Sequence, residues 1–246
     1  MNKKRLTILL ITIVLIIAGG LGGFFIYIGT YSKAEDKVYE YLKSDEYVEV
    51  IQEDDLYIYK PKSTRKGNVI FYQGGKVEYI AYAPLMYKLS KNGYQCYLPH
   101  LKFNLAFFDI NKASSIKEKY IDNQEEIYLL GHSLGGASLG NYAENNIEGY
   151  KGIGFLAAYT TADLSNTNLS SVFIYGDKDG VLNIEKYEEC KKNVNPNLSH
   201  EYIIEGGNHA GFGMYGNQKD DNEASISQLV QMDLTVNYLV SIWDND

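Results

Sequence analysis

The first apolar segment of the chain is long and has no charged residue. It runs from Leu6 to Ile28 and follows the basic residues Lys3, Lys4 and Arg5. A helix needs about 20 apolar residues to cross the hydrocarbon core of a bilayer, so this segment predicts a transmembrane helix. The basic residues would stay in the cytoplasm, which places the rest of the chain on the other side of the membrane.

A cleaved signal peptide is a second interpretation of the same segment. Leu6–Ala18 would be its apolar core, and Ala18-Gly19-Gly20 or Ser32-Lys33-Ala34 its cleavage site. A buried helix of a soluble protein is a weaker third interpretation, because core helices are rarely apolar on every face. Both leading interpretations export the remaining chain. We therefore expect a single-pass cell-membrane protein with its globular part outside the cytoplasm, or a secreted one if the segment is cleaved.

The rest of the chain has two further patterns of apolar and polar residues. Residues 33–43 form a polar, helix-compatible connector, and the alternating segments Tyr47–Ile51 and Leu56–Tyr59 flank the turn-like Glu53-Asp54-Asp55. These two segments predict an antiparallel hairpin. Beyond Gly67, short β-rich segments alternate with helical ones, which is typical of a parallel sheet with helices on both faces.

The predicted elements fill the chain almost without a gap. Strands are expected at Asn68–Tyr72, Tyr94–Leu98, Glu126–Leu130, Gly152–Leu156, Ser171–Tyr175 and Tyr202–Ile204. Helices are expected near Glu78–Lys91, Leu105–Lys119, Ser133–Asn145, Ile184–Lys191 and Ala224–Trp243. Only Thr160–Ser170 resembles a linker, so no separate lid domain is expected. The predicted organisation is an N-terminal stub and anchor or signal at 1–32 and one globular α/β domain at 33–246.

Composition agrees with one globular core and excludes several classes of function. The chain has 246 residues, of which 45% are hydrophobic, enough for one sizeable core. Residues 34–246 carry 19 basic and 31 acidic side chains, a net charge of −12. Without a basic surface the chain cannot neutralise a phosphate backbone, so nucleic-acid binding is excluded. The 23 tyrosines and nine phenylalanines exclude a disordered chain.

No motif for a metal or cofactor is evident. The sequence has no HExxH, no P-loop and no GxGxxG after a strand, so we expect neither a metal nor a cofactor. Cys96 and Cys190 have no metal-ligand spacing. They are either two free thiols or, since the domain is expected outside the cytoplasm, one disulfide.

A candidate nucleophile lies between a predicted strand and a predicted helix. Gly131-His132-Ser133-Leu134-Gly135 fits the G-x-S-x-G pattern, in which a sharp turn exposes the serine in a strained conformation. Small residues on either side let the backbone of the strand and the helix pass closely. The alternative is a glycine-rich turn with an incidental serine.

A serine hydroxyl needs an adjacent base, and that base needs an orienting acid. His209 is the preferred base because it lies in a glycine-rich loop after the last predicted strand, and His100 is the second choice. Asp179 is the preferred acid, because three residues beyond a strand leave room for its loop to turn inward. Asp177, which would more naturally cap the turn, and then Asp163 are the alternatives.

The order Ser133, Asp179, His209 is that of the α/β-hydrolase fold. Residues ~67–243 resemble the α/β-hydrolase superfamily, specifically its small single-domain, dienelactone-hydrolase-like serine hydrolases. Further stretches carry the resemblance: Phe71-Tyr72-Gln73-Gly74-Gly75, Ala81-Tyr82-Ala83-Pro84-Leu85, Tyr175-Gly176-Asp177-Lys178-Asp179-Gly180 and Gly206-Gly207-Asn208-His209. The dienelactone hydrolases proper use a cysteine nucleophile, so dienelactone is not the expected substrate.

The resemblance implies a hydrolase of ester or acyl bonds that uses these three residues. It also implies an oxyanion hole made by the backbone N–H of Leu134 and one from the Gln73–Lys76 loop. Within that loop glycine lets a backbone N–H approach the substrate closely, so Gly75 is preferred, with Gly74 or Lys76 next. In lipases this loop begins with His-Gly, which is replaced here by Gln73-Gly74. The alternative interpretation is that Gly74-Gly75 only forms a turn and has no part in an oxyanion hole.

The sequence therefore predicts a membrane-tethered serine hydrolase that cleaves carboxylester or related acyl bonds of a small-molecule substrate. An acyltransferase or a peptidase would use the same triad. A catalytically silent binding or scaffold protein on the same fold is the alternative from another class, and the complete set of triad residues argues against it.

Overall fold

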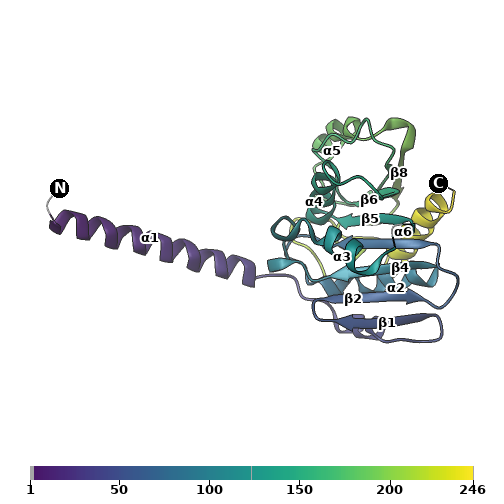
Figure 1. Cartoon of the computed structure of the whole chain (residues 1–246), viewed down its shortest axis with the longest axis horizontal. Coiled ribbons are helices and arrows are strands. Elements are labelled where there is room, and N and C mark those ends of the chain that lie inside the picture. Colours follow the sequence, from purple (N-terminus) through teal and green to yellow (C-terminus); the bar gives the residue numbers. More distant parts are fainter. Residues whose placement is uncertain (1–2, 123, 246) are drawn as a thin grey trace. The chain divides into compact units, whose positions relative to one another are not determined.

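The computed structural model describes residues 3–122 and 124–245 and divides the chain into two units between Tyr31 and Ser32 (Figure 1). The first unit is helix α1, Lys3–Gly29. Its segment Leu10–Gly29 is long and apolar enough to cross a membrane, and the side chains described there are almost all exposed. This exposure is unlike that of a core helix. A membrane anchor and a signal sequence remain as the two interpretations of α1.

The second unit is built on one eight-stranded sheet within the described residues, with the strand order β1-β2-β4-β3-β5-β6-β7-β8. The strands are β1 Val48–Glu53, β2 Leu56–Pro61, β3 Gly67–Tyr72, β4 Tyr94–Pro99, β5 Ile127–His132, β6 Gly152–Leu156, β7 Ser170–Gly176 and β8 Ser199–Ile204. Strand β2 is antiparallel to β1 and β4, and all other neighbours are parallel. The predicted hairpin and the mostly parallel sheet of an α/β-hydrolase fold are confirmed.

Helices connect the parallel strands. The α-helices of the second unit are α2 Ala83–Lys91, α3 Lys112–Tyr120, α4 Leu134–Ala143, α5 Ile184–Cys190 and α6 Gln228–Trp243. The 3₁₀ helices are η1 Asp36–Leu42, η2 Tyr79–Tyr82, η3 Lys102–Asn104, η4 Ala106–Asp109, η5 Lys191–Asn193, η6 Pro196–Leu198 and η7 Ala210–Phe212. Each predicted helix has a counterpart, but three of them differ from the prediction. The first, expected near Glu78–Lys91, consists of η2 followed directly by α2.

The helix predicted at Leu105–Lys119 is divided into η4 and α3. The hydroxyl of Tyr72, on β3, donates to the carbonyl of Ile110 and accepts from the amide of Ala113. A side chain from the sheet thus satisfies backbone groups that a continuous helix would pair internally. The last helix begins at Gln228 and not at Ala224, because Ser227 caps it by accepting a hydrogen bond from the amide of Val230.

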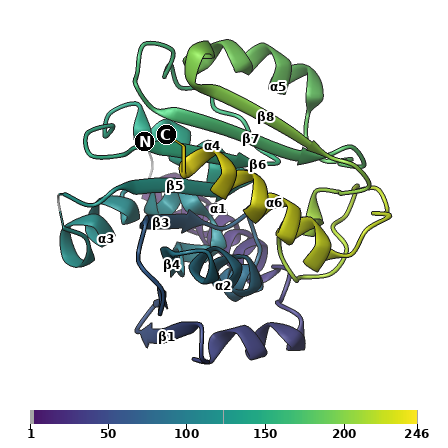
Figure 2. The same cartoon turned by 90° about the vertical axis from the view of Figure 1, so that its right-hand side faces the viewer.

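The core lies on both faces of the sheet. Along β3, Val69 and Phe71 face the side that packs against α2 and α6, whereas Ile70 and Tyr72 face the side that packs against α3, α4 and α5. Figure 2 shows α2 and α6 side by side on one face. Every residue of β3 is buried, as expected for a parallel strand covered on both faces.

The parallel strands all end at one edge of the sheet, which we call the carboxyl edge. The loops after β3, β5, β7 and β8 carry Gly75, Ser133, Asp179 and His209 respectively. Ligands of open α/β sheets bind at this edge. The two cysteines lie elsewhere, Cys96 within β4 and Cys190 at the end of α5, and both are buried free thiols.

Candidate active site

Ser133 lies in a strained turn between β5 and α4. Its backbone has φ 51° and ψ −123°, a conformation that is uncommon for a residue with a side chain. The amide of Ser133 donates to the carbonyl of Leu156 over 2.9 Å, which fixes the turn to β6. A Cβ on Gly135 would lie 2.2 Å from the carbonyl oxygen of Tyr72, so only glycine lets α4 pass this close to β3. The turn has the geometry of a nucleophile elbow.

A buried hydrogen bond joins His209 to Asp179. Nδ1 of His209 lies 2.9 Å from Oδ2 of Asp179, and each side chain is 2% exposed. The other oxygen, Oδ1, accepts hydrogen bonds of 2.8 Å from the amides of Val181 and Leu182. The carboxylate is therefore fixed from both sides. It orients the histidine so that Nδ1 donates and Nε2 is left to accept a proton.

The rival acids have other partners. Oδ1 of Asp177 accepts a hydrogen bond from the amide of Gly206 and so ties the β7 loop to the β8 loop. The exposed carboxylate of Asp163 accepts hydrogen bonds from the amide and the hydroxyl of Ser165. Neither of these interactions involves His209.

The rival base, His100, also contacts other residues. Its ring stacks on Tyr79 with centroids 5.0 Å apart, and its Nδ1 lies 3.7 Å from Oδ1 of Asp55. His200 is part of β8. Of the predicted candidates, the structure joins only Asp179 and His209 as a carboxylate–imidazole pair.

Ser133 and His209 line one cavity of about 300 Å³. Its walls also include Leu134, Ala157 and Leu182. Nε2 of His209 is buried and has no hydrogen-bond partner within residues 3–122 and 124–245. Ser133 and His209 thus line the same cavity, and Nε2 of His209 makes no hydrogen bond to the Ser133 hydroxyl. Catalytic hydrogen bonds of this kind often form only when substrate is bound.

Of the three loop amides considered for the oxyanion hole, those of Gly74, Gly75 and Lys76, the structure leaves that of Gly75 available. The amide of Gly74 donates to the hydroxyl of Tyr82 over 3.1 Å, and that of Lys76 donates to the carbonyl of Asn104 over 2.7 Å. In the described part of the chain, the amide of Gly75 has no acceptor. A Cβ on Gly75 would lie 2.8 Å from Cδ2 of Leu134, so the two residues expected to form the oxyanion hole are in close contact.

His132 has a role that the sequence did not indicate. It is buried and precedes Ser133, with Nδ1 2.8 Å from the hydroxyl of Tyr82 and Nε2 3.1 Å from the backbone oxygen of His209. Burial, with a contribution from the nearby His209, lowers the pKa of His132 well below its usual value. His132 is therefore a neutral side chain that links the nucleophile turn to the histidine loop.

Asp221 is a second residue that the sequence did not single out. Its carboxylate accepts hydrogen bonds from the amides of His209, Ala210 and Gly180, over 3.3, 2.9 and 3.0 Å. One side chain thus holds the loop of the histidine and the loop of Asp179 together. The polar segment around Asp221 follows no predicted strand and matches no motif, so no signal in the sequence points to it.

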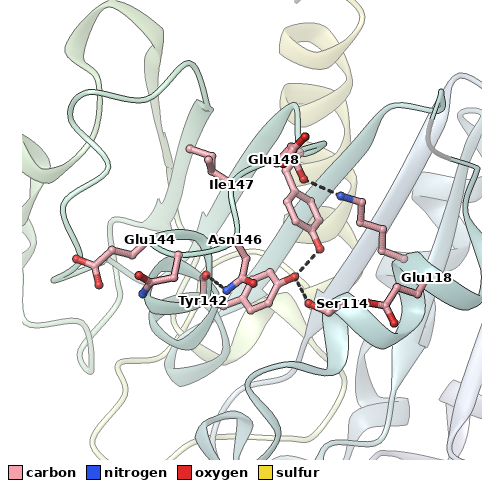
Figure 3. A pocket seen from close by; sticks show the side chains of 10 residues that line it. Ser114, Glu118, Tyr142, Glu144, Asn146, Ile147 and Glu148 are labelled. Atoms are coloured by element: carbon pink, nitrogen blue, oxygen red, sulfur yellow. Dashed lines mark hydrogen bonds between the residues drawn. The ribbon is translucent and has the colours of Figure 1, made fainter.

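A larger cavity, of about 600 Å³, lies between α3 and the loop after α4 (Figure 3). The hydroxyl of Tyr142 lies 2.7 Å from both Ser114 Oγ and Tyr150 Oη, and Lys117 donates to the carbonyl of Glu148. These polar groups satisfy one another. None of the predicted catalytic residues lines this cavity, so its size does not make it the active site.

No cluster of three or more His, Cys, Asp or Glu side chains suited to a metal ion is found among the residues that the structure describes. The candidate site, as the hydrogen bonds and the cavity define it, consists of Ser133, His209 and Asp179, with the two amides of the candidate oxyanion hole.

The model of one protein family, the alpha/beta hydrolase family, matches residues 68–233. This chain belongs to the alpha/beta hydrolase family. The match covers more than half of the chain and includes the loops that carry the predicted triad. A search of curated protein sequences finds no significant match.

Solved structures of hydrolases resemble this family member in fold. An esterase from Pyrobaculum calidifontis has a TM-score of 0.61 at 16% identity, covering 85% of this chain and 89% of its own. Carboxylesterase CesB from Bacillus subtilis has a TM-score of 0.58 at 9% identity, covering 86% and 96%. A putative dienelactone hydrolase from Klebsiella pneumoniae has a TM-score of 0.56 at 14% identity, covering 78% and 92%. At such identities the likeness establishes the fold and not the substrate.

Proposed function

We propose that this α/β hydrolase is a membrane-tethered serine hydrolase that cleaves carboxylester or related acyl bonds. The observation that carries the proposal is the 2.9 Å hydrogen bond from His209 Nδ1 to Asp179, which leaves His209 Nε2 without a partner in the described part of the chain, while His209 and Ser133 line the same cavity. This is the arrangement in which a histidine can take the proton of a serine hydroxyl. The esterases among the structural neighbours support the choice of acyl substrates.

The proposed reaction follows from the position of each group. Oγ of Ser133 attacks the substrate carbonyl carbon while Nε2 of His209 takes the hydroxyl proton, and Asp179 stabilises the imidazolium that forms. The amides of Gly75 and Leu134 hold the oxyanion of the tetrahedral intermediate, each contributing about 3–4 kcal/mol. The intermediate collapses, His209 donates its proton to the leaving alcohol, and water hydrolyses the acyl-enzyme by the same steps.

The proposed tether is α1. Its exposed apolar segment Leu10–Gly29 is long enough to cross a bilayer, and the basic residues Lys3, Lys4 and Arg5 precede it. The domain that begins at Ser32 would then lie on the extracytoplasmic side.

A fluorophosphonate probe tests the catalytic part of the proposal on the full chain in detergent micelles. We expect covalent labelling of wild type at Ser133 and none in Ser133→Ala. Ser138→Ala is the matched control, because Ser138 lies on α4 and its hydroxyl donates to the carbonyl of Leu134. Unchanged labelling of Ser133→Ala would reject the assignment, and a wild type that reacts with neither probe nor p-nitrophenyl esters would favour a silent binding protein.

A further inference from the structure

Three exposed phenylalanines lie together in the segment between β4 and α3. Phe103, Phe107 and Phe108 are 42%, 50% and 41% exposed. The ring centroids of Phe103 and Phe108 are 5.4 Å apart, and those of Phe107 and Phe108 are 4.3 Å apart. No charged residue interrupts the sequence from Phe103 to Phe108. We call these three residues the phenylalanine cluster.

The cluster belongs to the carboxyl edge of the sheet. The carbonyl of Asn104 accepts from the amide of Lys76, beside the candidate oxyanion amide. The buried side chain of Gln73 donates to Oδ1 of Asn104 over 3.0 Å and accepts from the amide of Leu101 over 3.3 Å. The segment that carries the phenylalanines is therefore fixed to the oxyanion loop by backbone and side-chain hydrogen bonds.

The same loop receives the chain as it enters the domain. The amide of Ser32 donates to the carbonyl of Lys76 over 2.8 Å, and the amide of Glu78 donates to the carbonyl of Ser32 over 2.9 Å. Helix α1 ends at Gly29, three residues before Ser32. Three residues span at most about 10 Å, so the covalent link from the end of α1 to Ser32 is short.

We infer that the phenylalanine cluster inserts into the interface of the membrane that holds α1, and that the substrate is an amphiphilic ester whose carbonyl lies at that interface. The inference rests on the proposed function and names its substrate class. Residues 34–246 have a net charge of −12, which disfavours attraction to anionic headgroups, so the contact has to come from apolar insertion.

The size of the active-site cavity agrees with such a substrate. At about 300 Å³ it lies at the lower end of the range for small-molecule sites. It has room for the ester group and a short part of the substrate, while the remaining apolar part stays in the bilayer. Phenylalanine is one of the residues by which proteins insert into the boundary between headgroups and acyl chains, where an ester carbonyl of a lipid lies.

A tryptophan placed in the cluster measures the insertion directly. The chain has one tryptophan, Trp243, which is buried and gives a constant background. Phe107→Trp is compared with Tyr47→Trp in the full chain, reconstituted in phosphatidylcholine vesicles with and without brominated acyl chains. Tyr47 is also exposed, but it precedes β1 at the opposite edge of the sheet. We expect brominated lipid to quench the emission added by Phe107→Trp and not that added by Tyr47→Trp.

A paired activity measurement tests the substrate class. Phe107→Ser/Phe108→Ser should hydrolyse a diacylglycerol ester embedded in vesicles roughly tenfold more slowly than wild type, because two partly exposed rings no longer enter the bilayer. Hydrolysis of water-soluble p-nitrophenyl acetate should be unchanged. Tyr47→Ser should match wild type on both substrates.

The outcomes separate the inference from the proposed function. Absence of quenching in Phe107→Trp, in vesicle-bound chain that still reacts with the fluorophosphonate, overturns the inference alone. If Phe107→Ser/Phe108→Ser hydrolyses both substrates more slowly by the same factor, the inference is also wrong. The two rings would then be needed for the structure of the domain and not for contact with the membrane. Chain that does not float with vesicles overturns the anchor and the inference together, and chain that leaves both ester substrates intact overturns the serine-hydrolase proposal.

Discussion

His132 donates a hydrogen bond from Nε2 to the backbone carbonyl oxygen of His209, 3.1 Å away. A carbonyl oxygen can only accept, so Nε2 carries the proton and Nδ1 accepts one from the hydroxyl of Tyr82. The oxygen of Tyr82 in turn accepts the amide hydrogen of Gly74. A one-way series of hydrogen bonds thus joins the oxyanion loop to the loop of the candidate base, through two buried side chains.

Removal of the Tyr82 hydroxyl is expected to loosen both ends of this series. In Tyr82→Phe the ring still packs against Phe71, so the fold should persist. The amide of Gly74 and Nδ1 of His132 each lose a buried partner, which costs about 1–3 kcal/mol per group. We expect kcat on p-nitrophenyl acetate to fall roughly tenfold with little change in KM.

Tyr59→Phe is the matched control for that measurement. The hydroxyl of Tyr59 is buried in β2 and has no hydrogen-bond partner among the residues that the structure describes. Its removal should leave kcat unchanged. Equal kcat for both variants and wild type would show that the Tyr82 hydroxyl does not position the site, whereas a loss of near-UV circular dichroism would assign it a merely structural role.

The neutral state of His132 predicts how stability depends on pH. Its pKa is lowered in the folded chain, chiefly by burial, whereas the unfolded side chain titrates near 6.5. Below pH 6.5 the unfolded state therefore binds one more proton than the folded state, and stability falls as pH falls. Above pH 6.5 the titration of His132 does not lower the free energy of unfolding. Below pH 6.5 it lowers this free energy by about 1.4 kcal/mol per pH unit, until the pH reaches the pKa of His132 in the folded chain.

His132→Gln isolates this contribution, since glutamine can donate and accept but does not titrate here. Urea unfolding of the full chain in micelles between pH 7.5 and 5 should show a shallower pH dependence in His132→Gln than in wild type, by about one proton. If the free energy of unfolding depends on pH in the same way in both proteins, His132 takes up its proton in the folded state as it does in the unfolded state.

The sequence predicted most of the sheet because each strand is a short apolar segment bounded by turn residues. It also predicted that Ser133, Asp179 and His209 follow parallel strands, whose carboxyl ends meet at one edge. The break between η4 and α3 was not predictable, because it depends on a hydroxyl from β3, about 40 residues earlier. Asp221 was missed for a similar reason: its partners come from two loops that only the fold brings together.

Asp221 is expected to act as a positioning residue for the candidate base. Oδ1 of Asp221 accepts from the amides of His209 and Gly180, and Oδ2 accepts from that of Ala210, so both oxygens are used. Asparagine keeps only one oxygen acceptor, so Asp221→Asn loses at least one of these hydrogen bonds to the histidine loop. We expect kcat to fall roughly tenfold, because the imidazole of His209 would be misplaced. The free energy of unfolding should change by less than the activation free energy does. Asp220→Asn, at the exposed neighbouring position, is the control and should behave as wild type.

The proposed topology is testable with single introduced cysteines, because Cys96 and Cys190 are buried. Glu46→Cys, at an exposed position, should react with a membrane-impermeant maleimide in intact cells. Asn2→Cys should react only after the membrane is permeabilised, since the basic residues that follow it favour the cytoplasm. The opposite labelling pattern would reverse the orientation. A mature chain that lacks Asn2 and begins between Gly19 and Glu35 would replace the anchor by a cleaved signal.

The role of Asp179 can be separated from that of Asp177 by kinetics. Asp179→Asn keeps the shape of the side chain but leaves the Nδ1 of His209 without a carboxylate, so that Nε2 can carry the proton and no longer accept one. We expect kcat to fall by about 10⁴-fold, as in the serine-protease precedent for the wrong tautomer. KM should change little, because the carboxylate lies behind the histidine and does not line the cavity. Asp177→Asn should be mild, since one of its oxygens can still accept from the amide of Gly206. An active Asp179→Asn beside an inactive Asp177→Asn would transfer the role to Asp177, and full activity of both would contradict the triad.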